Sequence, residues 1–128
     1  MTNELEGLLV DGTEIDKKLV AEILSSFIRI DKNTCEIRPL GSWNDLKATV
    51  KILVYLLARK AMIALELSID DEAASTTEII NNTGMAGGTV RPRLRELLGE
   101  RFLAQTKEQK YYVPNYAIER VKEIIVVG

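Results

Sequence analysis

The sequence predicts a mainly α-helical fold that carries two small β-hairpins. Apolar residues recur at helical spacing in several segments of the chain. In two places, a cluster of turn-forming residues lies between two short runs rich in β-branched and aromatic residues. This pattern is typical of β-hairpins. The chain has 128 residues, of which 46% are hydrophobic and 28% charged, so it is long enough for one domain with its own core and has the composition of an ordinary globular protein.

Residues 1–43 are predicted to form an N-terminal extension made of one helix and one hairpin. The helix lies in residues 15–27, with Asp16 near its start. Its apolar face consists of Ile15, Leu19, Ile23, Leu24 and Phe27. Residues 27–30 and 35–38 favour two strands joined by a turn. Cys35 stands where such a loop often needs a left-handed residue, so we interpret it as a loop position and not as a reactive thiol.

The longest predicted helix, residues 44–67, is apolar on most of its circumference. Ser42 and Asn44 are candidate N-caps for it. Two apolar stripes run along it, so we expect it to be buried on two sides. Two interpretations remain open: a central core helix between the N-terminal hairpin and the C-terminal part, or a helix with one side in a homodimer seam.

Residues 75–100 predict two short helices joined by a glycine turn. Ser75 and Glu78 have the spacing of a capping box, and Gly84 can supply the left-handed end of the first helix. The second helix is predicted over 89–100 and buries Val90, Leu94, Leu97 and Leu98. Because proline lacks an amide proton and clashes with the carbonyl four residues back, Pro92 should prevent this helix from beginning much before residue 89.

Residues 101–127 predict a hairpin followed by a C-terminal helix. The tip of the hairpin contains Lys107 and Lys110. Tyr111 and Tyr112 should point to opposite sides of the second strand, so only one of them is expected in the core. The helix is predicted over 115–127 with Asn115 as its N-cap.

This order of elements resembles the winged helix-turn-helix domain of prokaryotic transcription regulators. The residues that carry the resemblance are Glu78-Ile79, Thr83-Gly84, Met85, Gly88-Thr89-Val90, Leu94-Arg95-Glu96-Leu97 and Phe102-Leu103. The resemblance implies a winged-helix domain at 44–128, with a first helix at 44–67, a helix-turn-helix at 75–100, a wing at 101–114 and a C-terminal helix at 115–127. The resemblance does not extend to residues 1–43.

The resemblance further implies that helix 89–100 enters the major groove of duplex DNA and that the chain is a transcriptional regulator. Helical periodicity puts Thr89 and Arg95 on the outward face of this helix, with Arg91 and Arg93 on its flanks. The backbone amides of Gly87, Gly88 and Thr89 are expected to lie in a loose turn and to suit a phosphate. The alternative is that the glycines, Gly87 in particular, only permit close helix packing. Lys107 and Lys110 are expected to contact phosphates from the wing.

Charge sets a limit on this interpretation. The formal net charge is −2 and the isoelectric point is near 5.3. Residues 86–113 carry six basic residues against three glutamates, too few for tight binding by a monomer at physiological salt. We therefore expect a homodimer, formed through helix 44–67 or the C-terminal helix. The alternative is a winged-helix module for protein–protein interaction that does not bind DNA.

Several other classes of function find no support in the sequence. The chain has one cysteine and no histidine, so it can form neither an internal disulfide nor a zinc finger nor a histidine-dependent catalytic site. Asp70, Asp71 and Glu72 have no basic or metal-binding partner nearby and indicate a solvated linker. We expect no enzymatic activity, no cofactor and no metal site.

The N-terminal residues are acidic and lack a basic segment followed by a long apolar one, so no signal peptide is expected and a cytoplasmic location follows. The longest apolar run, residues 52–58, is too short to span a bilayer, and no membrane partner is expected.

Overall fold

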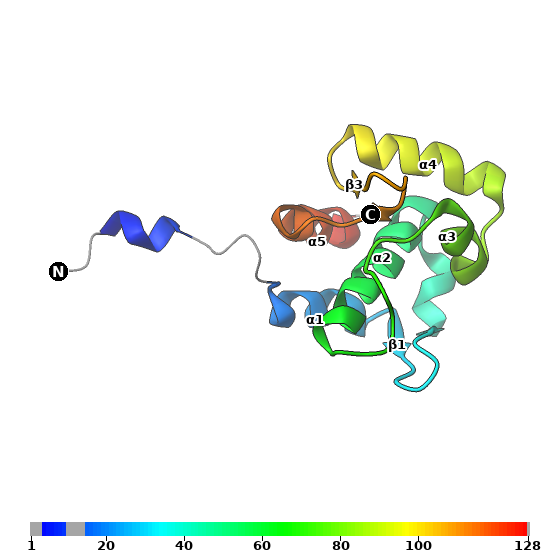
Figure 1. Cartoon of the computed structure of the whole chain (residues 1–128), viewed down its shortest axis with the longest axis horizontal. Coiled ribbons are helices and arrows are strands. Elements are labelled where there is room, and N and C mark those ends of the chain that lie inside the picture. The colour runs from blue at the N-terminus through cyan, green and yellow to red at the C-terminus, as the bar shows by residue number, and fades with distance from the viewer. Residues whose placement is uncertain (1–3, 10–14, 128) are drawn as a thin grey trace.

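A computed structural model of the chain describes residues 4–9 and 15–127, and it confirms a mainly helical fold with small antiparallel sheets (Figure 1). The described elements are η1 (Glu4–Leu8), α1 (Lys17–Ser25), β1 (Ile28–Ile30), β2 (Ile37–Pro39), η2 (Gly41–Asp45), α2 (Ala48–Ala64), α3 (Thr76–Thr83), α4 (Gly87–Gly99), β3 (Ala104–Gln105), β4 (Tyr111–Tyr112), η3 (Asn115–Ala117) and α5 (Ile118–Val127), where η denotes a 3₁₀ helix.

Helix α2 is the centre of the molecule. It packs against α1, α3, α4, α5 and β4, and its residues 52–58 are all buried. No side chain in this stretch is more than 3% exposed. The central-core interpretation is therefore confirmed for the middle of α2, because both of its sides are covered within one chain. The homodimer stays a prediction.

The start of α2 differs from the predicted one. Residues 41–45 form the separate turn η2, Leu46 is extended, and the helix begins at Ala48. The physical reason is Trp43, whose burial at 5% exposure requires the chain to turn into the core before the helix starts. The Ser42 hydroxyl donates its hydrogen bond to the carbonyl of Ser26 in the N-terminal part, so it is used there and does not cap α2. The helix also ends at Ala64 and not at residue 67.

The N-terminal helix and hairpin are close to their predicted positions. Asp16 caps α1 by accepting a hydrogen bond from the amide of Leu19. Strands β1 and β2 pair antiparallel, with Ile28 opposite Pro39 and Ile30 opposite Ile37. Cys35 has a φ angle of 58°, so the left-handed loop position predicted for it is confirmed.

One hydrophobic core runs from α1 to α5. The buried face of α1, formed by Val20, Ile23 and Leu24, packs onto the same cluster as the buried residues of α5. Helix α1 contacts α2 and α5, whereas α4 lies at the opposite end of the molecule from α1 and β1 (Figure 1). The N-terminal elements therefore leave α4 uncovered.

The loop of the N-terminal hairpin is held by Asp31. Its carboxylate accepts hydrogen bonds from the amides of Asn33 and Thr34, at 2.9 and 3.1 Å, and from the Arg38 guanidinium, at 2.7 Å. The bond from Arg38 is the largest cause, followed by those from the two amides, and together they lower the pKa of Asp31 from its usual 3.8 to about 2.

We expect the substitution Arg38→Ala to raise the pKa of Asp31 part of the way back to 3.8, measured by NMR titration of its carboxyl carbon. The stability that the lowered pKa contributes is fully present above pH 3.8 and is lost as the pH falls toward 2. The difference in stability between wild type and variant should therefore shrink over that interval. An Asp31 pKa that does not change in the variant would contradict the assignment of Arg38 as its main partner.

Candidate nucleic-acid interface

The joint between α3 and α4 has the predicted capping residues at both ends of α3. The Ser75 hydroxyl accepts from the amide of Glu78, and the Glu78 carboxylate accepts from the amide of Ser75, each at 3.1 Å. Gly84 ends the helix with a φ angle of 75°, the left-handed conformation expected there. Met85 packs against the core directly after the turn. The capping box and the left-handed Gly84 are therefore confirmed.

Helix α4 begins at Gly87, so the prediction of a start at residue 89 after a loose turn is wrong. Gly87 and Gly88 are part of its first turn, and the amides of Thr89 and Val90 both donate to the carbonyl of Ala86 at 3.0 Å. Pro92 lies inside the helix. Because proline has no amide proton, the carbonyl of Gly88 lacks its helical hydrogen bond. Gly88 is exposed in the first turn, so water can bind this carbonyl instead.

The arginines on the solvent face of α4 differ in whether an ion pair already holds their guanidinium group. Val90, Leu94 and Leu97 are buried as predicted, while Leu98 is half-buried. Arg91 and Arg95 are exposed, one turn apart, and within the described part of the chain neither belongs to an ion pair.

Arg93 is held differently from the other two arginines. Its guanidinium donates to both carboxylate oxygens of Glu96, at 2.8 and 3.0 Å. Gly88 and Thr89 are exposed at the N-terminal end of the same face, and Ala86 supplies no side-chain cap to the first amides. The exposed groups on α4 that can meet an anion are therefore Arg91, Arg95 and the end of the helix that begins at Gly87.

Strands β3 and β4 form a short hairpin beside α4 (Figure 1). They pair antiparallel, with Gln105 opposite Tyr111. At the tip, the amide of Thr106 donates to the carbonyl of Lys110 at 2.8 Å, and the Thr106 hydroxyl accepts from the amide of Lys110 at 3.1 Å. Lys107 is exposed and Lys110 half-buried.

Tyr111 and Tyr112 are both half-buried, but only Tyr111 packs against the hydrophobic core, so the prediction that one of the two is a core residue is confirmed. Tyr111 also exchanges two main-chain hydrogen bonds with Ala74, at 2.8 and 2.9 Å. Ala74 therefore forms an isolated bridge to the edge of β4 that does not face β3. Tyr111 packs against the core, and Tyr112 lies along a cleft that also includes Pro114 and Tyr116.

Arg59 positions this region, although it was not among the residues predicted from the sequence. Its guanidinium, with a side chain only 13% exposed, donates to three consecutive main-chain carbonyls: Asp71 at 2.6 Å, Glu72 at 3.0 Å and Ala73 at 3.2 Å. It also lies 3.5 Å from the Glu78 carboxylate. The available signal was the basic pair that ends the apolar run of α2, together with the acidic linker that follows the helix.

Lys60 makes a second buried connection from α2. Its ammonium group donates to the Glu72 carboxylate and to the side-chain oxygen of Asn115, both at 2.7 Å. Asn115 begins the 3₁₀ turn η3, and the α-helix predicted from residue 115 starts only at Ile118. The linker, α2 and the end of the β3–β4 hairpin are thus joined through one lysine that is 5% exposed.

The far end of α4 is secured by α5. The Arg120 guanidinium lies 4.3 Å from the centre of the Phe102 ring and donates to the carbonyl of Glu100 at 3.2 Å. Helix α4 is therefore held at its start by the Gly84 turn and at its end by this contact.

Within residues 4–9 and 15–127, no group of three or more histidine, cysteine, aspartate or glutamate side chains is arranged to hold a metal ion. None of the helices described in that part of the chain has the length and apolarity that a membrane span requires. No protein-family model, curated protein or solved structure matches the chain.

The turn at Gly84 can be tested against a second glycine. A Cβ atom at Gly84 or at Gly88 would meet nothing within 4 Å, so the two sites differ in backbone conformation and not in available space. We expect Gly84→Ala to destabilise the protein by about 1–2 kcal/mol because alanine is strained at a φ angle of 75°. Gly88→Ala, inside a helix, should stabilise it by about 0.5–1 kcal/mol. Urea unfolding measures both, and shifts of equal sign would contradict the interpretation.

The role of Arg59 can be tested with a side chain of similar length. Arg59→Met leaves three carbonyls and Glu78 without the guanidinium, so we expect a loss of roughly 2–5 kcal/mol in the free energy of unfolding. The amides of Ala74 and Tyr111 should also exchange faster with solvent. Arg95→Met, at an exposed position, should change stability by less than about 0.5 kcal/mol. If the Arg59 variant is as stable as the Arg95 variant, the hydrogen bonds of Arg59 to the linker do not contribute to stability.

Proposed function

We propose that this chain is a winged-helix protein that binds duplex DNA and regulates transcription in the cytoplasm, with no enzymatic activity. In this proposal α2, α3 and α4 are the helices of the helix-turn-helix, β3 and β4 form the wing, and α4 lies in the major groove. The observation that carries the proposal is the pair Arg91 and Arg95, exposed and outside any ion pair in the described residues, on the open face of a helix joined to α3 by a left-handed glycine.

The position of α4 supports this assignment. Recognition of base edges requires a helix whose outer face is not covered by the rest of the protein. α1 and β1 lie at the far end of the molecule from α4 (Figure 1), and α4 packs its buried face on α2 and α3. The N-terminal extension can therefore stay in place while α4 is in contact with DNA.

The proposed contacts follow from exposure and charge. Arg91, Arg95 and Thr89 are suited to guanine edges or phosphates, and the amides of Gly87 and Gly88 at the positive end of α4 are suited to a phosphate. Lys107 and Lys110 would contact phosphates from the wing. Arg93 would contribute less, because Glu96 competes for its guanidinium.

The net charge of −2 implies that a single copy binds weakly, since few phosphates are neutralised. A dimer that places two copies of α4 on successive turns of the duplex would double the number of contacts.

A second candidate function is a docking module for another protein. Glu96 on α4 and Glu100 directly after it are exposed near the arginines, and this mixed charge would suit a protein surface better than a phosphate backbone. In this alternative, α4 is the same contact helix with a different partner.

The affinity for duplex DNA of mixed sequence, measured by fluorescence anisotropy at two salt concentrations, tests the proposal. We expect Arg91→Ala/Arg95→Ala to weaken binding at least about tenfold, since each arginine contact to a base is worth roughly 1–3 kcal/mol. If the contacts are to phosphates, the slope of log affinity against log salt should fall by about two units in magnitude. Arg93→Ala should have a smaller effect.

The matched control is Lys18→Ala/Lys32→Ala, which removes the same charge from exposed positions in the N-terminal part. It should leave binding nearly unchanged. The DNA proposal fails if the wild-type protein binds no duplex at low salt, or if the two double variants lose affinity equally. No duplex binding in the wild type would favour the docking module.

A further inference from the structure

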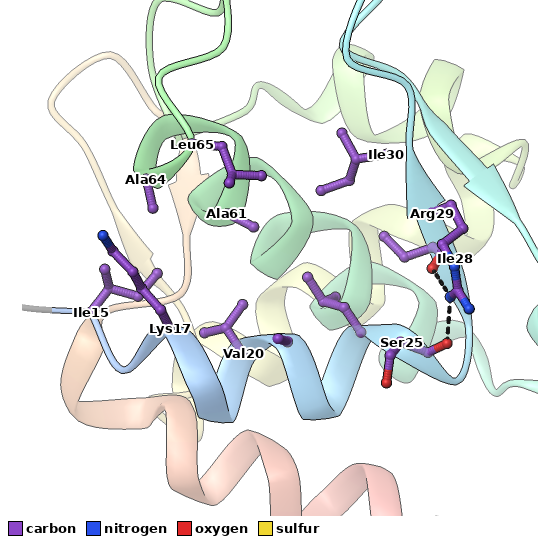
Figure 2. Close-up of a pocket in the computed structure, with 12 residues that line it drawn as sticks. Ile15, Lys17, Val20, Ser25, Ile28, Arg29, Ile30, Ala61, Ala64 and Leu65 are labelled. Carbon is purple, nitrogen blue, oxygen red and sulfur yellow. Dashed lines mark hydrogen bonds between the residues drawn. The ribbon is translucent and has the colours of Figure 1, made fainter.

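An apolar groove of about 310 Å³ lies at the end of the molecule opposite α4, between α1, β1 and the last turns of α2 (Figure 2). Its apolar lining includes Val20, Ile28, Ile30, Ala61, Ala64 and Leu65. Leu65, at the rim, is 63% exposed. An apolar cavity of about 150 Å³ already accepts a benzene-sized group, so this groove has room for roughly two leucine side chains.

The charged residues at the groove are basic. Ile15 and Lys17 lie at one end of it, and Arg29 lies toward the other end (Figure 2). The Arg29 guanidinium donates to the carbonyls of Ser25 and Ile28, which fixes its position. No carboxylate is among the residues that line the groove. The site therefore suits an apolar group that is followed or preceded by acidic residues.

The N-terminal segment of the chain, Glu4 to Leu9, has these properties. Leu8 and Leu9 are both 77% exposed, and Leu5 is 67% exposed. Glu4 and Glu6 are its charged residues, in the first turn of η1. We call this segment the arm; in Figure 1 it lies apart from the body that contains the groove. Large exposed leucines beside acidic residues are the complement of an apolar groove with a basic rim.

We propose that the groove binds the arm of a second copy of this chain, and that two copies exchange arms to form a homodimer. Leu8 and Leu9 of each copy fill the groove of the other, and Glu4 and Glu6 face Lys17 and Arg29. The exchange is reciprocal, so the assembly closes with twofold symmetry. It does not rest on DNA binding, and it places the dimer contact away from both α4 and the buried middle of α2.

A second copy fits the groove better than the arm of the same chain. Ile15 is itself part of the lining, so a chain that returned to its own groove would have to reverse within the five residues between Leu9 and Ile15. In Figure 1 the arm extends away from the body of its own chain, and Leu8 and Leu9 are both 77% exposed, so the arm does not fill the groove of the same chain. The arm of another copy enters without this restriction.

Light scattering over a range of protein concentrations, in the absence of DNA, tests the dimer directly. The mass should rise from 14.3 kDa toward twice that value. Leu8→Ser/Leu9→Ser and Leu65→Glu should both remain at the mass of one chain. The matched control is Ile63→Glu, an exposed apolar residue of α2 that does not line the groove, and it should dimerise like wild type.

A charge exchange tests the groove without altering its apolar lining. Lys17→Glu should weaken dimerisation roughly threefold or more, as expected for the loss of exposed ion pairs. Glu6→Lys introduced into the same chain should restore it. This variant keeps the test valid if Leu65→Glu fails to fold.

Cross-linking separates exchange from closure within one chain. One copy carries Glu4→Cys and the other Ser25→Cys, both with Cys35→Ser, and a bis-maleimide joins the thiols. A product of twice the chain mass supports the exchange. The proposal is overturned by a wild type that stays at 14.3 kDa at every concentration, by a dimer that persists in the arm and groove variants, or by a cross-link that forms only within a chain carrying both cysteines.

Discussion

The contact of the Arg59 guanidinium with residues 71–73 is the constraint on which the functional end of the molecule depends. Three successive carbonyls turn toward one buried charge. The residue that follows them, Ala74, pairs with β4, and the next, Ser75, caps α3. The position of the hairpin and the start of the helix pair are therefore set by one side chain of α2. The planar guanidinium, with five donors, can bind three carbonyls and still face the Glu78 carboxylate, whereas a lysine has only three donors.

The α4 end and the groove end of the molecule share one core but expose different surfaces, so they can bind different partners. Helix α2 passes between the two ends and supplies buried residues to both. Its last turn borders the apolar groove, and its residue Arg59 holds the linker that leads to α3. The acidic composition of the whole chain conceals this separation, because the arginines of α4 and the carboxylates of the arm lie on different parts of the molecule. An average charge is thus a poor guide to what either surface contacts.

Features governed by local backbone chemistry could be predicted from the sequence. The capping box of Ser75 and Glu78 and the left-handed residues Cys35 and Gly84 depend on a few neighbouring residues, and the structure has each of them. The start of α2 could not be predicted, because Trp43 is drawn into a core built from distant segments. The start of α4 was misjudged because a proline early in a helix removes only one bond, at an exposed carbonyl. Arg59 has partners 12 to 14 residues away, beyond any local pattern.

The complete burial of the middle of α2 has a consequence for how the protein unfolds. Ile52, Leu53, Leu56 and Leu57 have no exposed surface, and the elements that cover them come from both halves of the sequence. Neither half can detach without exposing this helix to water, so separate opening of one half is unfavourable. We therefore expect the two ends of the molecule to unfold together, and the amide protons in the middle of α2 to exchange only when the whole domain opens.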